Sequence, residues 1–258
     1  MKYLETYSPI IKEASPSQIR SDSSLSGKLI FAKEGKLQVN YAPFDYVNSE
    51  AKIALVGITP GRQQATNALL ALNAALNEGD DLATAAKKAK EFGSFSGPMR
   101  KNLIASLDSI GLARKLGIAS TAELWGSRTD IVHFTSGVMY PTYVLGSGEP
   151  KNWNGHPRTA KSVLLSKITR ERLGEEIRKL AANGAIIVAL GDKAFEAVEC
   201  SGSSNMCKVT QIPHPSPANN ERIAYFNGHR PREHCSKMVD TDKLDKLRDV
   251  AKEIVATM

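Results

Sequence analysis

Four short apolar runs, separated by segments with helical patterning, constrain the fold of this chain most strongly. The runs are rich in β-branched residues and lie at residues 53–56, 130–134, 185–190 and 209–212. Apolar runs of this length are typical of strands that are buried on both faces of a parallel sheet. Because strands and helices alternate, we expect an α/β fold in which helices flank a doubly wound sheet of about four parallel strands.

Two of these runs continue directly into loops of unusual composition. The first leads into residues 57–61 (Gly-Ile-Thr-Pro-Gly), and the last leads into residues 214–217 (His-Pro-Ser-Pro). In open α/β sheets, ligands bind beyond the carboxyl ends of the strands, where both loops leave the sheet. Glycine permits a close approach of the backbone to a ligand, and proline stiffens each loop. We therefore expect these two loops to form a functional site.

Composition and charge indicate the kind of partner. The chain has 258 residues, a net charge of +7 and a pI of about 9.2, which suits a polyanion such as DNA. Its three cysteines follow no disulfide spacing, as is typical of a reducing cytosol. The N-terminus has no apolar signal core, and no apolar run is long enough to span a membrane. We expect a cytoplasmic monomer, associated with the nucleoid if the source is bacterial.

The chain divides into an N-terminal extension, residues 1–49, and an α/β domain, residues 50–258. In the extension, residues 15–28 are rich in Ser, Pro and Gly, which predicts an irregular or mobile stretch, and a small hairpin with a glycine turn follows. In the domain, residues 64–91 are Ala-, Leu- and Lys-rich and predict an insertion of two helices. The loop at residues 140–158 is too long for a plain connection, so we expect it to be functional.

The two motif loops resemble the signature loops of the uracil-DNA glycosylase superfamily. Two further segments carry the resemblance: residues 95–98 (Phe-Ser-Gly-Pro) precede an amphipathic helix, and residues 187–194 form a strand that continues into Gly-Asp-Lys-Ala. Their order and approximate spacing match from about residue 50 to the C-terminus. The resemblance implies a three-layer α/β sandwich that excises a base from DNA.

The resemblance also implies roles for single residues, because in this family the target nucleotide leaves the stack and enters a pocket. Phe95 would stack on the base, and Gly57 and Ile58 would lie beside it. His214 would donate a hydrogen bond to the base oxygen on which negative charge collects as the glycosidic bond breaks. Thr59 stands where uracil-excising members commonly have Asp or Asn, and its hydroxyl could only position the attacking water.

Two departures from the family pattern concern specificity. His133 aligns with the Asn that reads uracil, and an imidazole cannot copy the donor and acceptor of an amide. Gly61 replaces the Tyr that blocks substituents at C5, as in mismatch-type members, and leaves that side open. Both departures predict a base other than plain uracil: a 5-substituted pyrimidine, a deaminated purine, or a hypermodified base of the kind found in viral DNA. The last of these would suit a role in antiviral defence.

We expect polar residues from three segments to contact DNA: the loop at residues 214–217, called the histidine loop below, the chain that follows it, and the long loop at residues 140–158. They are Ser216, Asn219, Asn220, Arg222, Arg230, Arg232 and Arg158. Ser216 is expected to bond a phosphate. Because Ala218 is too short to fill the space of a flipped base, one of the polar residues just after it would do so, unless the substrate is already unpaired. Trp153 and His156 of the long loop are expected to line the pocket or grip DNA.

No metal or cofactor is expected. Iron–sulfur members of the superfamily use four cysteines, and this chain has three. Zinc ligands drawn from Cys207, His214, His229 and His234 would fit no standard spacing.

Three interpretations of function remain open. The first is a monofunctional DNA glycosylase, since no lysine occupies a motif position from which it could form a Schiff base. The second, prompted by Thr59, is a non-catalytic DNA-binding member that recognises a flipped or damaged base without cleaving it. The third, a generic α/β nucleotide-binding protein with accidental motifs, is disfavoured by the histidine loop and the Phe95 segment. A panel of modified oligonucleotides, treated with alkali after incubation, would separate the first two.

Overall fold

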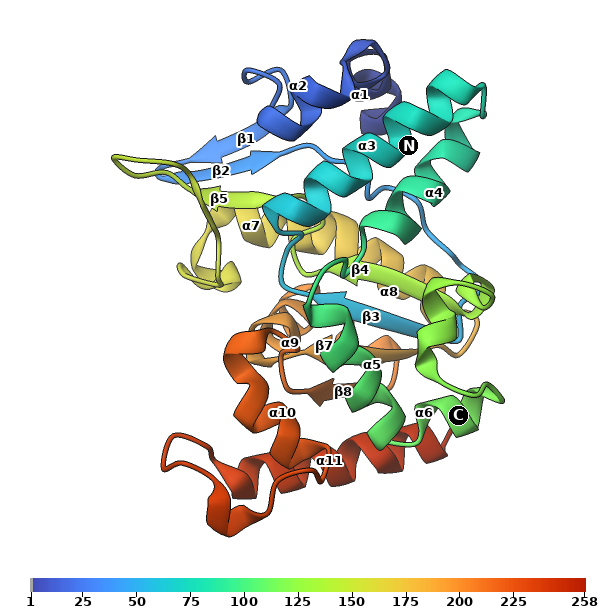
Figure 1. Cartoon of the computed structure of the whole chain (residues 1–258), viewed down its shortest axis with the longest axis vertical. Coiled ribbons are helices and arrows are strands. Elements are labelled where there is room, and N and C mark those ends of the chain that lie inside the picture. Colours follow the sequence, from blue (N-terminus) through green and yellow to red (C-terminus); the bar gives the residue numbers. More distant parts are fainter. Residues whose placement is uncertain (1) are drawn as a thin grey trace.

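The computed structural model describes residues 2–258, and within that range the chain forms two four-stranded sheets (Figure 1). One sheet is wholly parallel, with the strand order β4-β3-β7-β8. Its strands are β3 (Ile53–Gly57), β4 (Val132–Ser136), β7 (Ile186–Leu190) and β8 (Val209–Ile212). These are the four apolar runs of the sequence, and most of their side chains are buried.

Helices cover both faces of the parallel sheet because alternate side chains of a strand point to opposite faces. On β3, Ile53 and Leu55 pack with one group of helices, whereas Ala54 and Val56 pack with the other. The first group is α5 (Met99–Ser109), α6 (Leu112–Leu116), α10 (Asn220–Phe226) and α11 (Thr241–Ala256); the second is α8 (Gly174–Ala181) and α9 (Asp192–Cys200). The expected α/β fold, with four parallel strands between two layers of helices, is confirmed.

The second sheet is antiparallel and joins two distant parts of the chain. Its strands, in the order β1-β2-β5-β6, are β1 (Ile30–Glu34), β2 (Leu37–Asn40), β5 (Thr142–Val144) and β6 (Lys151–Asn152). The first two strands are the hairpin segment of the extension, and the last two come from the long loop at residues 140–158. The long loop is therefore ordered partly by pairing with the N-terminal segment.

Four helices pack with this second sheet around a shared apolar core (Figure 1). They are α1 (Lys2–Glu13), α2 (Pro16–Ser21), α3 (Arg62–Glu78) and α4 (Leu82–Gly93), and α7 (Val163–Ile168) adds to the same core before one π-helical turn leads into α8. The prediction of an irregular stretch from residue 15 is wrong for its first part. Ser15 caps α2 and forms a capping box with Gln18, so the turns begin only after Ser21.

The Ala-rich segment at residues 64–91 lies within the two helices α3 and α4. The first helix ends at Gly79, whose φ of +96° is a left-handed conformation that glycine adopts without strain. Asp81 caps the second helix by accepting hydrogen bonds from two backbone N–H groups. The helices approach closely, since a Cβ on Gly93 would lie 2.8 Å from the Cβ of Ala68.

Within residues 2–258, no helix is both long and apolar enough to cross a membrane. In the same range, no group of three or more His, Cys, Asp or Glu residues is placed to hold a metal ion. The three cysteines, Cys200, Cys207 and Cys235, form no disulfide.

Candidate active site

A cavity of about 390 Å³ lies beyond the carboxyl ends of β3 and β8. It is bounded by the loop after β3, the segment before α5, the long loop and the histidine loop after β8. Among the residues that line it are eight singled out from the sequence: Gly57, Ile58, Thr59, Gly61, Phe95, Trp153, His214 and Ser216. The fold thus brings together three motif segments that are far apart in the sequence.

The histidine loop fixes which nitrogen of His214 carries the proton. The backbone N–H of Ser216 donates a hydrogen bond to Nδ1 of His214 over 3.3 Å. A neutral imidazole that accepts at Nδ1 carries its proton on Nε2. Burial lowers the pKa of His214 from its usual 6.5, which favours the neutral form. His214 is therefore a neutral hydrogen-bond donor through Nε2.

Gly191 provides the space in which the histidine loop lies. Its φ is +86°, and a Cβ built on it would lie only 2.8 Å from the Cβ of His214. Real Cβ atoms do not tolerate such a contact, so any other residue here would displace the loop. The glycine in the segment after β7 is therefore required by the position of His214.

Phe95 lies against the bare backbone at the end of β3. A Cβ on Gly57 would lie 3.0 Å from Cε1 of the Phe95 ring, so the close approach depends on glycine. Phe95 has a φ of +52°, which is rare for a bulky residue, and its N–H donates a hydrogen bond to Oε1 of Gln64 over 3.2 Å. Such strained conformations concentrate at functional sites, where the surrounding structure holds them in place.

Thr59 lines the cavity, but the proton of its hydroxyl is already engaged. Oγ1 of Thr59 donates to the carbonyl oxygen of Tyr140 over 2.8 Å. The phenol of Tyr140 in turn donates to Asp45 over 2.8 Å, so Tyr140 links this loop to the N-terminal segment. The Thr59 oxygen can still accept a hydrogen bond from a water molecule. It can position that water but cannot act as a general base near neutral pH.

Next to Gly61, where the sequence predicts open space, the amide of Asn152 forms part of the cavity wall. Nδ2 of Asn152 lies 3.5 Å from the point at which a Gly61 Cβ would stand. Asn152, Trp153 and Asn154 of the long loop all line the cavity. Of these, only Trp153 was singled out from the sequence. The two asparagines carried no signal there, because their place in the cavity results from long-range strand pairing.

The prediction that His133 reads the base is wrong. The strand ends at Ser136 rather than at residue 134, so His133 lies in the middle of β4 and pairs with Ala54. Its side chain is 1% exposed, and Nε2 lies 3.3 Å from Oε1 of Glu176. Its Nδ1 accepts a hydrogen bond from the backbone N–H of Asn48 over 3.3 Å. At the carboxyl end of β4 stands a small residue, Ser136, opposite Gly57.

His133 belongs to a buried charged cluster, composed of Lys90, His133, Thr135 and Glu176. Lys90 and Glu176 are each 2% exposed, and Nζ of Lys90 lies 3.2 Å from Oε1 of Glu176. Thr135 donates a hydrogen bond to the other carboxylate oxygen. Burial alone would raise the pKa of Glu176, but the Lys90 ammonium, His133 and Thr135 outweigh it and lower that pKa to about 2. The cluster joins α4, β4 and α8.

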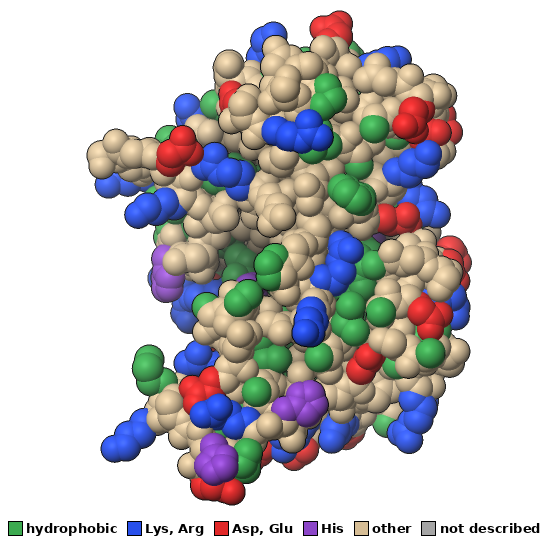
Figure 2. Space-filling view, viewed as in Figure 1, with side chains coloured by type: hydrophobic (Ala, Val, Ile, Leu, Met, Phe, Trp, Pro, Cys, Tyr) green, Lys and Arg blue, Asp and Glu red, His purple; other side chains and the backbone are tan. Residues whose placement is uncertain are grey.

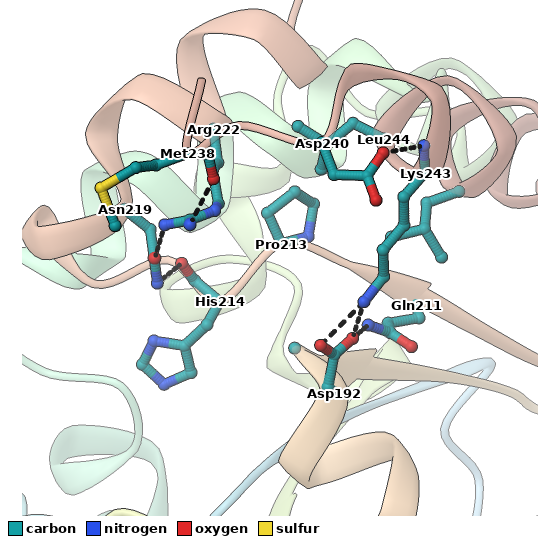
Figure 3. A pocket seen from close by; sticks show the side chains of 12 residues that line it. Asp192, Gln211, Pro213, His214, Asn219, Arg222, Met238, Asp240, Lys243 and Leu244 are labelled. Carbon is teal, nitrogen blue, oxygen red and sulfur yellow. Dashed lines mark hydrogen bonds and ion pairs between the residues drawn. The ribbon is translucent and has the colours of Figure 1, made fainter. Parts of the chain in front are cut away.

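A second cavity of about 390 Å³ lies on the other side of the histidine loop (Figure 3). Asn219, one of its lining residues, donates to the carbonyl oxygen of His214 over 3.2 Å and accepts from Arg222. Arg222 also donates to the carbonyl oxygen of Met238 over 2.9 Å. In this structure, Asn219 and Arg222 thus hold the histidine loop in place on the side that faces the second cavity. On the far wall, Lys243 and Asp192 form an ion pair at 2.8 Å.

The other arginines expected to contact DNA are paired with carboxylates. Arg158 lies 3.2 Å from Glu196, Arg230 lies 3.4 Å from Glu221, and Arg232 bonds Asp242 and Asp245 at 2.7 Å. Asn220 accepts a hydrogen bond from Asn102, which also donates to the carbonyl oxygen of Pro215. On the face shown in Figure 2, basic and acidic side chains are interspersed rather than gathered into one patch. Contacts of these residues with DNA remain a prediction.

The fold and the cavity define an α/β protein with a site formed by a glycine loop and a histidine loop at the carboxyl edge of its parallel sheet. The family model described as the uracil DNA glycosylase superfamily matches residues 44–237, most of the chain. This chain belongs to that superfamily.

The chain is similar to a curated protein and to a solved structure. The protein YoxB of Bacillus subtilis (strain 168), described as uncharacterised, is 30% identical over 221 residues, covering 83% of this chain and 84% of YoxB. The crystal structure of wild-type SMUG2 from Pedobacter heparinus is 12% identical, covers 99% of this chain and 96% of that chain, and has a TM-score of 0.41.

Proposed function

We propose that this protein is a monofunctional DNA glycosylase, which flips a base out of DNA and hydrolyses its N-glycosidic bond. One observation carries the proposal: Phe95 and the neutral donor His214 line the same cavity at the carboxyl edge of the parallel sheet. A flipped base needs an aromatic face and polar groups at its edge. The cavity has the size typical of small-molecule sites and offers both.

The chemistry follows from the charges that develop as the bond breaks. The sugar becomes positive and the departing base negative. The Nε2 proton of His214 would bond the base oxygen on which the negative charge collects, and its neutral form already carries that proton. Water is the nucleophile, and Thr59 accepts a hydrogen bond from it. No lysine is among the described residues that line the cavity, which supports a mechanism without a Schiff base.

We propose that the excised base is not plain uracil. The end of β4 presents Ser136 instead of an amide that could match both polar positions of the uracil edge. Gly61 leaves room for the small amide of Asn152 but carries no side chain of its own. A 5-substituted pyrimidine or a deaminated purine fits this arrangement, as does a hypermodified base of viral DNA, and the last would place the protein in antiviral defence.

The test is a panel of duplex and single-stranded oligonucleotides, each with one modified base, incubated with the protein and then treated with alkali. We expect strand cleavage at one or more modified bases. His214→Ala should slow single-turnover cleavage about 100- to 1,000-fold, because the donor acts on charge present only in the transition state. Binding should change little. Retention of the wild-type rate by His214→Ala would remove this residue from the mechanism.

The same panel tests the alternative of a non-catalytic DNA-binding member. The reason for this alternative is Thr59, which cannot serve as a base. Its hydroxyl donates a hydrogen bond to the carbonyl oxygen of Tyr140. A protein of this kind would bind some modified bases and leave all of them uncut. Turnover on any base that is abolished by His214→Ala excludes it.

A further inference from the structure

The peptide bond between Ser94 and Phe95 is held by hydrogen bonds at both of its polar groups. Its N–H donates to Oε1 of Gln64 over 3.2 Å. Its carbonyl oxygen accepts from a guanidinium nitrogen of Arg100 and from the indole nitrogen of Trp125, each over 3.1 Å. A carbonyl oxygen has two lone pairs, so both acceptor positions are filled. We call Gln64, Arg100 and Trp125 the peptide clamp.

The clamp holds an orientation that the backbone alone disfavours. Phe95 has a φ of +52°, in the left-handed region that bulky residues rarely adopt, and Ser94 has a φ of −65° and a ψ of 123°. Half a turn of the peptide between them would move the ψ of Ser94 into the helical region. The same turn would bring the φ of Phe95 to a negative value. The turned peptide thus relieves the strain at Phe95.

The clamp residues make the turned orientation unfavourable. In that orientation the carbonyl oxygen would face the acceptor Oε1 of Gln64, and the N–H would face the donors of Arg100 and Trp125. Three hydrogen bonds would be lost, and Ser94 is only 5% exposed, so water has little access to replace them. Buried donors and acceptors without partners are costly. The clamp therefore selects the strained orientation of the peptide.

Two of the clamp residues also support the ring of Phe95. The guanidinium of Arg100 lies 5.3 Å from the centre of the Trp125 ring, and Trp125 stacks on Phe134 with ring centres 5.0 Å apart. Phe134 in turn meets the ring of Phe95 edge-on, with centres 6.0 Å apart. A turn of the peptide would tilt the Cα–Cβ bond of Phe95 and move its ring away from these neighbours. Peptide and ring are therefore positioned together.

We propose that Gln64, Arg100 and Trp125 are positioning residues, which hold Phe95 in the orientation in which it stacks on the flipped base. The inference rests on the proposed function, since it requires a base against Phe95. Loss of one clamp hydrogen bond should weaken binding of that base about 2- to 10-fold. The base is stacked in the bound state as well as in the transition state, so the rate at saturation should change little.

The test removes the two donors to the Ser94 carbonyl oxygen separately. Arg100→Met deletes the donor and keeps an unbranched side chain, whereas Arg100→Lys keeps a donor and should recover part of the binding. Trp125→Phe deletes the indole N–H and keeps an aromatic ring on Phe134, and it covers a failure of Arg100→Met to fold. Dissociation constants are measured with duplexes that carry 5-hydroxymethyluracil or hypoxanthine on a 2′-fluoro sugar, which resists cleavage. The cleavable duplexes give single-turnover rates at saturating protein.

A double-mutant cycle shows whether the clamp acts through Phe95. In a Phe95→Ala background the ring is gone, so Arg100→Met and Trp125→Phe should weaken binding no further. A general structural role would weaken binding equally in both backgrounds. Arg248→Met is the matched control, because the guanidinium of Arg248 lies 5.9 Å from the centre of the Tyr225 ring, outside the residues that line the cavity. It should leave binding and rate unchanged.

The crystal structure of the double variant Arg100→Met/Trp125→Phe without DNA gives a readout that needs no activity. We expect the Ser94–Phe95 peptide to be turned. A peptide in the wild-type orientation, or unchanged binding, would overturn the inference and leave the glycosylase intact. A turned peptide with weaker binding, in a protein whose wild type cleaves no base, would support the inference and overturn the activity. A wild type that binds neither probe and cleaves neither base would overturn both.

Discussion

A methyl group at residue 191 would occupy space that the histidine loop fills. Gly191→Ala places a Cβ 2.8 Å from that of His214 and also strains a backbone with a φ of +86°. The loop must move, and a small misplacement of a catalytic donor is costly to the rate. We expect single-turnover cleavage to fall at least about 10-fold.

Gly184→Ala is the matched control for that variant. Gly184 has a φ of +66°, but a Cβ there would meet nothing within 4 Å. It should therefore cost stability, about 1 kcal/mol, without slowing cleavage. Equal rates in the two variants would show that Gly191 does not position His214.

A second prediction for His214 follows from its lowered pKa. Burial favours the neutral imidazole, whose Nδ1 accepts from Ser216 and whose Nε2 donates. Protonation of Nδ1 would break the Ser216 bond and release the ring. The acid limb of a single-turnover pH–rate profile should therefore lie below pH 6.5, the usual value for histidine. A rate that already falls above pH 6.5 would contradict the neutral-donor role.

Residues in local motifs could be placed from the sequence, whereas those set by distant pairing could not. Phe95 and His214 lie in short segments whose prolines and glycines fix the local chain, and both reach the cavity. His133 was misplaced because the strand ends two residues later than its apolar pattern indicates. Asn152 was missed because its bond to Arg62 joins residues 90 positions apart.

At the scale of elements, α4 shows why a helical pattern does not reveal every buried position. Lys90 lies in an Ala- and Lys-rich segment in which lysines are normally solvated. Its ammonium is instead buried, where it contacts Glu176 of α8 and donates to the carbonyl oxygen of Tyr46. Glu176 lies 86 residues away from Lys90, and nothing local in the sequence indicates that the two side chains meet.

Removal of Lys90 should destabilise the protein strongly. Lys90→Ala leaves the Glu176 carboxylate buried without its cation, and such a change costs about 3–5 kcal/mol. Urea unfolding should show this loss as a lower midpoint. Lys87→Ala, in the same helix, removes a partly exposed lysine with only an i,i+4 ion pair and should cost less than about 1 kcal/mol. Similar losses in both variants would mean that the buried pair contributes little.

The two sheets show that strands, too, can be predicted from the sequence only where the local pattern is clear. The four parallel strands were evident because each is a continuous apolar run, and their alternation with helices specifies the layers. The pairing of β2 with β5 was not evident, because β5 is short and lies in a Gly- and Pro-rich loop. Strand pairing over such distances depends on tertiary packing rather than on local pattern.

For the molecule as a whole, the net charge of +7 does not show which basic side chains are free to contact DNA. Arg158, Arg230 and Arg232 each contact carboxylates in this structure, so a phosphate would have to compete for them. The sequence predicted a polyanionic partner but could not show these ion pairs.

Global stability should fall in acid, and the buried cluster determines the direction. His133 has a pKa lowered from 6.5, first by burial and then by the Lys90 charge, so below pH 6.5 the unfolded chain gains a proton that the folded chain does not. Glu176 has its pKa lowered from 4.5 to about 2, so its contribution is complete above pH 4.5 and is lost as the pH falls toward 2.

The free energy of unfolding, measured by urea at a series of pH values, should therefore decrease below pH 6.5 and more steeply below pH 4.5. Glu176→Gln removes the carboxylate while keeping its size. The stability difference between wild type and this variant should be largest above pH 4.5 and should shrink toward pH 3. Below pH 4.5, Glu176 binds a proton in the unfolded chain but not yet in the folded chain, and this favours unfolding of the wild type. A difference that stays constant from pH 7 to pH 3 would show that Glu176 is not held ionised by Lys90 and His133.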